Sequence, residues 1–189
     1  MIQGLRLTVL LDACVLYPAP IRDLLLHLAD AELYIPKWTD KIHEEWTRNL
    51  LLNRPDLTAS QLSRTTKAMS MAFPEATVHY YEALITSIDL PDPNDRHILA
   101  AAIQARAQVI VTANLKDFPQ NCLNQYDIGV QHPDEFITYL LQLNPQAVLS
   151  AFRTQVTNLK NPSKTAQEVI QNLRKAGLET TADRLTALL

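Results

Sequence analysis

The sequence predicts an α/β fold: an α/β/α sandwich with a central parallel sheet, followed by a small helical extension. The first observation is a segment over residues 5–11 that is apolar almost throughout, which is typical of a strand buried on both faces. The second is the pattern of a helix and another strand that follows, because a strand, a helix and a strand in succession form the unit of parallel sheets. The third is a change beyond residue 144, where only helical patterns remain.

The expected elements begin with the strand that ends in Asp12. A helix is expected over residues 19–33, where Pro20 suits the first turn and apolar residues recur at helical spacing. Thr58 and Gln61 predict a capping box at the start of a later helix. The other expected elements are strands at 33–36, 108–112 and 127–131, and helices at 40–53, 57–72, 80–87 and 133–143, with one more that starts near Asp95.

Three helices are expected in the C-terminal segment. The first begins after Asn144. Thr165 with Glu168 predicts a capping box for the second, and Thr180 with Asp183 predicts one for the third.

Charge is distributed unevenly along the 189 residues, a length that suits one domain or one domain with a small appendage. The formal net charge of −3 argues against a protein that holds nucleic acid by bulk positive charge. Residues 145–189 have six basic and three acidic side chains, a net charge of +3, which leaves −6 on residues 1–144. We therefore expect an acidic α/β domain over residues 1–144 and a basic helical extension over residues 145–189.

The composition excludes several classes of protein. Hydrophobic residues make up 47% of the chain and charged residues 20%, as in globular proteins. Three glycines are too few for a Gly-rich phosphate loop, and two cysteines without CxxC spacing cannot form a four-ligand zinc site, so both are expected to be free thiols. No apolar run approaches the roughly 20 residues that span a bilayer. The N-terminal segment shows no clear signal-peptide cleavage site, so we expect a soluble, cytoplasmic protein.

Polar side chains follow two of the expected buried strands. Asp12 ends the first strand, while Thr112, Asn114 and Asp117 follow the strand at 108–112. In open parallel sheets, ligands bind outside the carboxyl ends of the strands, so these groups are expected at one edge. The alternatives are that Asp12 caps the following loop and that the other three residues form an ordinary turn.

Two further carboxylates are expected on helices. At about 100° per residue, Glu45 lies beside the buried stripe of its helix, whereas Glu44 points to solvent. The alternative role for Glu45 is an ion pair with Arg48 or a neighbour. Asp92 and Asp95 stand at a helix start, where capping and the helix dipole account for Asp92 and offer an alternative role for Asp95.

Asp12, Glu45, Asp95 and Asp117 thus lie on separate elements that a parallel α/β fold can bring together. Several carboxylates in one cleft repel each other unless a cation neutralises them. Oxygen ligands favour Mg²⁺ or Mn²⁺ over zinc, because hard cations prefer carboxylate and water. These residues therefore predict a magnesium site that handles phosphates.

The segments around these acids resemble the motifs of PIN-domain ribonucleases of the VapC toxin family: LLDACVLYP, IHEEWTRNL, LPDPNDRHILAAAI and VTANLKDF. The similarity spans residues 5–143, and the tail resembles the small helical extension of one subgroup. The resemblance implies metal-binding roles for Asp12, Glu45 and Asp95, with Asp117 or Asn114 completing the site. Asn114 stands where many members have Asp, and Asp117 comes slightly later than the usual spacing.

The resemblance also implies a function: a Mg²⁺-dependent endoribonuclease that is the toxin of a type II toxin–antitoxin system. The metal, Mg²⁺ or Mn²⁺, would activate a water and stabilise charge on the leaving oxygen. Thr112 and Asn114 would support the site as polar neighbours of the ligands. The implied partners are an RNA substrate, a VapB-like antitoxin that covers the acidic cleft, and a second copy in a homodimer, with no membrane.

Other interpretations stay open from the residues alone. A non-catalytic PIN-like module would bind RNA or protein without divalent ions. An aspartyl-phosphate enzyme suits Asp12, although the chain lacks a second acid two residues later. Arg96 and His97 can contact phosphate, or form a surface ion pair and pack the helix. Trp38 and Trp46 can stack on bases or, as we expect, pack in the core.

Overall fold

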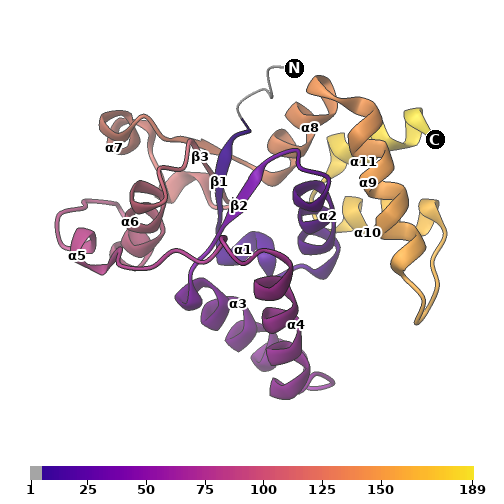
Figure 1. Cartoon of the computed structure of the whole chain (residues 1–189), viewed down its shortest axis with the longest axis horizontal. Helices are drawn as coiled ribbons and strands as arrows, with labels where there is room; N and C mark the ends of the chain where they lie inside the picture. Colours follow the sequence, from indigo (N-terminus) through magenta and orange to yellow (C-terminus); the bar gives the residue numbers. More distant parts are fainter. Residues whose placement is uncertain (1–5) are drawn as a thin grey trace. The chain divides into compact units, whose positions relative to one another are not determined.

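The computed structural model describes residues 6–189, which form two compact units (Figure 1). The sheet unit comprises residues 7–17 and 35–131, and the helical unit comprises residues 18–34 and 132–189 together with Arg6. Leu5, the first residue of the expected N-terminal strand, lies outside the described residues. No helix in residues 6–189 has the length and apolar character that a membrane crossing requires.

The sheet unit is built on four parallel strands in the order β2-β1-β3-β4. They are β1 (Thr8–Leu11), β2 (Ile35–Lys37), β3 (Val109–Val111) and β4 (Gly129–Gln131). In the central pair, Leu11 lies opposite Val111, and both are fully buried. The expected parallel sheet is therefore confirmed, with strands shorter than the apolar runs that predict them.

The same unit also contains helices and 3₁₀ turns. They are α1 (Ala13–Leu16), α3 (Asp40–Asn53), α4 (Ala59–Ala72), α5 (Glu82–Ile85), η1 (Pro93–Asp95), α6 (Arg96–Gln104), η2 (Leu115–Asp117), α7 (Gln120–Leu123) and η3 (Asn124–Tyr126). Helix α6 packs on β1 and β3, and α3 packs against α1 and α4. The capping box at Thr58 and Gln61 is confirmed at the start of α4.

Helix α3 matters most for the site, and its sequence explains its position. The Thr39 side chain accepts a hydrogen bond from the backbone N–H of Ile42, which caps the helix. Ile42, Trp46 and Leu50 form its buried stripe. The indole of Trp46 donates a hydrogen bond to His43 Nδ1 over 3.0 Å, and Trp38 is also fully buried, so the expected core role of both tryptophans is confirmed.

The helical unit contains α2 (Ala19–Asp30), α8 (Pro133–Leu143), α9 (Pro145–Asn158), α10 (Ala166–Lys175) and α11 (Glu179–Leu188). Helix α2 packs on α9, while α11 packs on α8 and α10. Helix α2 ends before the expected residue 33, because Glu32 takes the left-handed conformation (φ 58°). The capping box at Thr165 and Glu168 is confirmed.

The expected capping box of the last helix is wrong. Helix α11 begins at Glu179, and no side chain of its N-cap residue binds its first turn. Instead, the Asp134 carboxylate accepts hydrogen bonds from the backbone N–H groups of Thr180 and Thr181, over 2.9 and 2.7 Å. Asp183 forms an ion pair with Arg174. A carboxylate distant in sequence therefore satisfies the exposed N–H groups that a local cap was expected to satisfy.

Candidate active site

Asp12 lies where the two central strands end. It follows β1, and its backbone N–H donates to the Val111 carbonyl on β3 over 3.1 Å. Asp12 is 8% exposed as a residue, and its Oδ2 accepts hydrogen bonds from the Thr112 hydroxyl (2.7 Å) and the Cys14 thiol (3.1 Å). The Asp12 side chain does not cap α1. The loop-capping alternative is therefore wrong, and two neighbours fix the carboxylate in place.

Cys14 is a part of the site that sequence reasoning missed. Burial and the adjacent Asp12 carboxylate raise the pKa of its thiol to about 12. The thiol therefore stays protonated at neutral pH and donates to Asp12. The backbone N–H of Ala113 donates to Sγ over 3.2 Å, which links α1 to the loop after β3. The available signal was its position two residues after the acid at a strand end.

Glu45 meets a buried histidine rather than Arg48. Its Oε1 lies 3.1 Å from Nε2 of His97, whose side chain is 2% exposed. The other ring nitrogen of His97, Nδ1, has no hydrogen-bond partner in residues 6–189, so Nε2 is the ring nitrogen that contacts Glu45. His97 therefore donates a hydrogen bond that holds Glu45, while Glu44 is exposed as expected.

Asp95 and Asp92 differ in what explains them. The Asp92 side chain accepts a hydrogen bond from the backbone N–H of Asn94 and caps η1, as expected. Asp95 stands at the N-cap of α6 but makes no side-chain cap. Burial, followed by the nearby carboxylates of Asp12, Asp92 and Asp117, raises the pKa of Asp95 to about 6. Capping thus accounts for Asp92 alone, and Asp95 lies among carboxylates that raise its pKa, an effect that His97 only partly offsets.

The segment after β3 brings Asn114 to the site more directly than Asp117. Asn114 lines the same pocket as Asp12 and Asp95, whereas Asp117 does not. The Asn114 side-chain amide donates a hydrogen bond to Asp117 Oδ2, and its backbone N–H donates to the Thr112 hydroxyl over 3.0 Å. Asp117 is nevertheless close enough to raise the pKa of Asp95.

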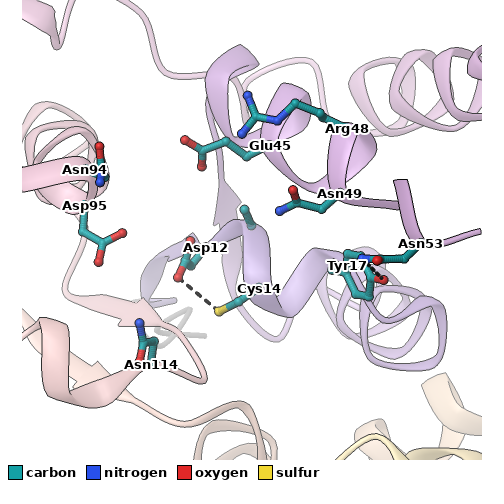
Figure 2. Close-up of a pocket in the computed structure, with 11 residues that line it drawn as sticks. Asp12, Cys14, Tyr17, Glu45, Arg48, Asn49, Asn53, Asn94, Asp95 and Asn114 are labelled. Carbon is teal, nitrogen blue, oxygen red and sulfur yellow. Dashed lines mark hydrogen bonds between the residues drawn. The ribbon is translucent and has the colours of Figure 1, made fainter. Parts of the chain in front are cut away.

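These groups surround one open pocket of about 450 Å³ in the sheet unit (Figure 2). Asp12, Glu45 and Asp95 face a common space, and Tyr17 and Asn53 lie at the opposite end. Its lining residues are Asp12, Ala13, Cys14, Tyr17, Glu45, Arg48, Asn49, Asn53, Asn94, Asp95 and Asn114. Sequence reasoning missed the far end, although Glu45, Asn49 and Asn53 recur at four-residue spacing on one helix face.

The oxygen atoms that line this pocket are of the chemical type that binds hard cations. They are carboxylate and carboxamide oxygens, which Mg²⁺ and Mn²⁺ prefer. Neither Asp12 nor Asp95 has an ion pair within residues 6–189. The pKa of Asp95 is raised first by burial and then by repulsion from the neighbouring carboxylates, and a cation would relieve that repulsion. In the same residues, no three Asp, Glu, His or Cys side chains form a group that could hold a metal ion. Hydrogen bonds to Thr112, Cys14 and His97 direct two of the carboxylates toward the protein instead.

Comparisons with protein families decide where the chain belongs. A family model described as PIN domain matches residues 8–116, more than half of the chain. The chain belongs to the PIN domain family. The matched segment carries Asp12, Glu45, Asp95, Thr112 and Asn114, and it ends just before Asp117. Membership of the PIN domain family also confirms the expected α/β/α fold class with a central parallel sheet.

The rest of the PIN domain protein also matches known sequences. A model described as VapC50 C-terminal domain matches residues 133–187. A Mycobacterium tuberculosis (strain ATCC 25618 / H37Rv) protein named "Putative ribonuclease VapC50" is 40% identical over 79 residues. That alignment covers 42% of this chain and 47% of the relative. No solved structure matches the chain. The resemblance to VapC-type PIN domains with a helical extension is thereby confirmed.

Proposed function

We propose that the protein is a metal-dependent endoribonuclease and the toxin of a type II toxin–antitoxin system. The observation that carries the proposal is a pocket in which Asp12 and Asp95 meet without a cationic partner in the described part of the chain. The ribonuclease named among its relatives supports the reaction class. We assign catalysis to the predicted domain over residues 1–144 and keep residues 145–189 as the predicted extension.

We assign Mg²⁺ or Mn²⁺ binding to Asp12, Glu45 and Asp95, with Asn114 or Asp117 as the fourth ligand. A bound metal supplies charge stabilisation to a phosphodiester and lowers the pKa of water at the site. Asn114 is favoured as the fourth ligand because it lines the pocket, whereas Asp117 does not line it and accepts a hydrogen bond from the Asn114 side chain.

The chain's own residues position these carboxylates. Thr112 and Cys14 donate to the same oxygen of Asp12, which leaves Oδ1 free of those two bonds. His97 donates to Oε1 of Glu45 and orients that carboxylate from inside the core. The pKa of Asp95 is raised to about 6, so its carboxylate is mostly charged only above that pH or beside a bound cation. Hydrogen bonds from neighbours that are not ligands commonly tune such sites.

The test is cleavage of RNA by the full chain with Mg²⁺, compared with Asp12→Asn and Asp95→Asn. We expect each substitution to lower the cleavage rate by at least about 100-fold, because each removes a charged metal ligand. Glu44→Gln is the matched control: it removes a carboxylate from the exposed face of α3 and leaves the rate unchanged. Undiminished cleavage by both site variants would show that the active site is elsewhere.

A toxin of this type is expected to have protein partners. We propose a VapB-like antitoxin that covers the acidic pocket, a homodimer and a cytoplasmic location. A short reading frame next to this one, and a stable complex on co-expression with its product, are the expected observations. Absence of a complex would remove the antitoxin from the proposal without affecting the nuclease test.

Beryllium fluoride separates the nuclease from an aspartyl-phosphate enzyme. No lysine lines the pocket in the described residues, so a lysine that could accompany a phosphorylated aspartate is missing there. We expect no trapping by beryllium fluoride. Trapping at Asp12 would overturn the nuclease proposal.

A further inference from the structure

The pocket has a second half that no acid lines. We call it the polar arm: Tyr17 from the end of α1, and Arg48, Asn49 and Asn53 from α3. Figure 2 shows Tyr17 and Asn53 at the end of the pocket opposite Asp95. The carboxylates that account for a metal site leave these four side chains without a role.

The polar arm runs along α3 away from the carboxylates. Glu45, Asn49 and Asn53 are four residues apart, so they share one face and span about 12 Å of helix rise. This length matches roughly three to four stacked nucleotides at 3.4 Å each. Asn53 Nδ2 donates to the Tyr17 hydroxyl over 3.3 Å, which ties the ring to the far end of the helix.

Arg48 gives the polar arm its charge. It is exposed, and it is the one cationic side chain that lines the pocket in residues 6–189. No ion pair joins Arg48 to a carboxylate in that part of the chain, even though Glu45 lies nearby, because Glu45 is bound by His97. Its guanidinium is therefore available to an external anion, and such groups bind phosphate with two parallel hydrogen bonds.

We propose that the polar arm binds the nucleotides that flank the cleaved bond in single-stranded RNA. Arg48 contacts a backbone phosphate, Tyr17 stacks on a base, and Asn49 and Asn53 hydrogen-bond to base edges or ribose hydroxyls. A single strand is favoured over a duplex, because a tyrosine ring can stack only on a base that has left the helix. The inference rests on the proposed nuclease function and assigns residues that would hold its substrate beside the carboxylates.

The experiment measures binding separately from cleavage. A labelled single-stranded RNA of ~12 nucleotides and mixed sequence is titrated by fluorescence anisotropy with the Asp95→Asn full chain, which also lowers repulsion of the RNA. In this background Arg48→Ala is expected to weaken binding about 10-fold and to lower the salt dependence by about 0.7 in slope, as for one lost phosphate contact. Tyr17→Leu is expected to weaken binding about 10-fold or more, with little change in slope.

Matched controls come from the same unit. Arg64→Ala removes an exposed arginine from the middle of α4, and Tyr126→Leu removes a half-buried tyrosine from η3, both outside the pocket. We expect neither to change binding. Tyr17→Phe keeps the ring and retains most of the affinity, whereas Arg48→Lys keeps the salt slope. An RNA hairpin without a single-stranded segment should bind at least about 10-fold more weakly.

The outcomes separate the two proposals. If the protein cleaves RNA but Arg48→Ala and Tyr17→Leu bind RNA like their controls, the proposed RNA binding by the polar arm is wrong, and the proposed nuclease function is unaffected. If these variants lose affinity while the unsubstituted chain cleaves no RNA with Mg²⁺ or Mn²⁺, the arm stands as a binding site and the nuclease fails. Equal binding of hairpin and single strand, or no binding by the Asp95→Asn chain, overturns the inference.

Discussion

The two halves of the pocket are built in opposite ways. In the acidic half, Asp12 and Glu45 are held by buried or half-buried neighbours. In the polar arm, Arg48 and Asn49 project from an exposed helix face, and Arg48 has no ion pair in the described residues. The difference teaches that the carboxylates are fixed before any ligand arrives, whereas the arm can adapt to its ligand. Substitutions in the acidic half should therefore alter stability, and substitutions in the arm should alter binding alone.

The largest expected effect comes from disturbing helix α3, which supplies residues to both halves of the pocket. Trp46 is fully buried beside Glu45 on α3, so Trp46→Ala should lower the free energy of unfolding by about 3–5 kcal/mol. Denaturant unfolding measures this effect. Leu52→Ala, at a side chain 76% exposed on the same helix, should stay within about 0.5 kcal/mol. Similar values for the two variants would show that packing of α3 does not support the site.

Thr112→Val tests the acidic half by itself. It leaves a buried carboxylate oxygen of Asp12 without its shortest hydrogen bond, so the free energy of unfolding should fall by about 1–3 kcal/mol. Cleavage of RNA should fall about 10–100-fold, because Asp12 loses its orientation. Thr112→Ser keeps the hydroxyl and should restore most of both properties. A Val variant that keeps full activity would show that Asp12 needs no such support.

Asp95→Asn should raise stability, and only above a defined pH. The pKa of Asp95 is raised from 3.8 to about 6 in the folded protein, so the folded state binds the proton more tightly than the unfolded state. The charged carboxylate therefore destabilises the fold progressively from about pH 4 to pH 6, and fully above that range. Because Asp95 is half-exposed, we expect a gain for Asp95→Asn of about 1 kcal/mol at pH 8 and none at pH 4.

Unfolding without divalent ions at the two pH values measures this gain. Mg²⁺ should raise the melting temperature of the unsubstituted chain at pH 8, because a bound ion relieves the same repulsion, and it should raise that of Asp95→Asn less. If Asp95→Asn were less stable than the unsubstituted chain at pH 8, the charged Asp95 carboxylate would not destabilise the fold.

The smallest expected effect on stability belongs to the polar arm. Asn49 is exposed in the middle of α3, so Asn49→Ala should change the free energy of unfolding by no more than about 0.5 kcal/mol. Binding of single-stranded RNA should nevertheless weaken, and anisotropy and unfolding on the same samples measure the two effects. A large loss of stability would erase the contrast between the two halves.

Local patterns predicted much of the fold. The expected bounds of α3 and α8 agree with the structure, because their apolar spacing and caps are local. The strands are shorter than expected, since pairing with neighbours rather than apolarity sets their ends. The cap of α11 could not be predicted, because Asp134 reaches it only through tertiary packing.

The candidate site divides in the same way. Asp12 was placed by its position at a strand end, and Glu45 by its angle on a helix, both of which are properties of single elements. The pairing of His97 with Glu45, and the contact of Asn53 with Tyr17, each join two elements, so no local pattern indicates them. The choice between Asn114 and Asp117 stays a prediction, because both contact the region of Asp95.

Cys14 gives the pocket a built-in reporter. With a pKa of about 12, only about one Cys14 thiol in 10⁵ is ionised at pH 7. Alkylating reagents that attack thiolates should therefore react with it very slowly. Loss of the Asp12 charge, or a movement that exposes the thiol, would lower that pKa and make the residue reactive. The rate of labelling at Cys14 can therefore report how tightly the ends of β1 and β3 stay closed while RNA or a metal binds beside them.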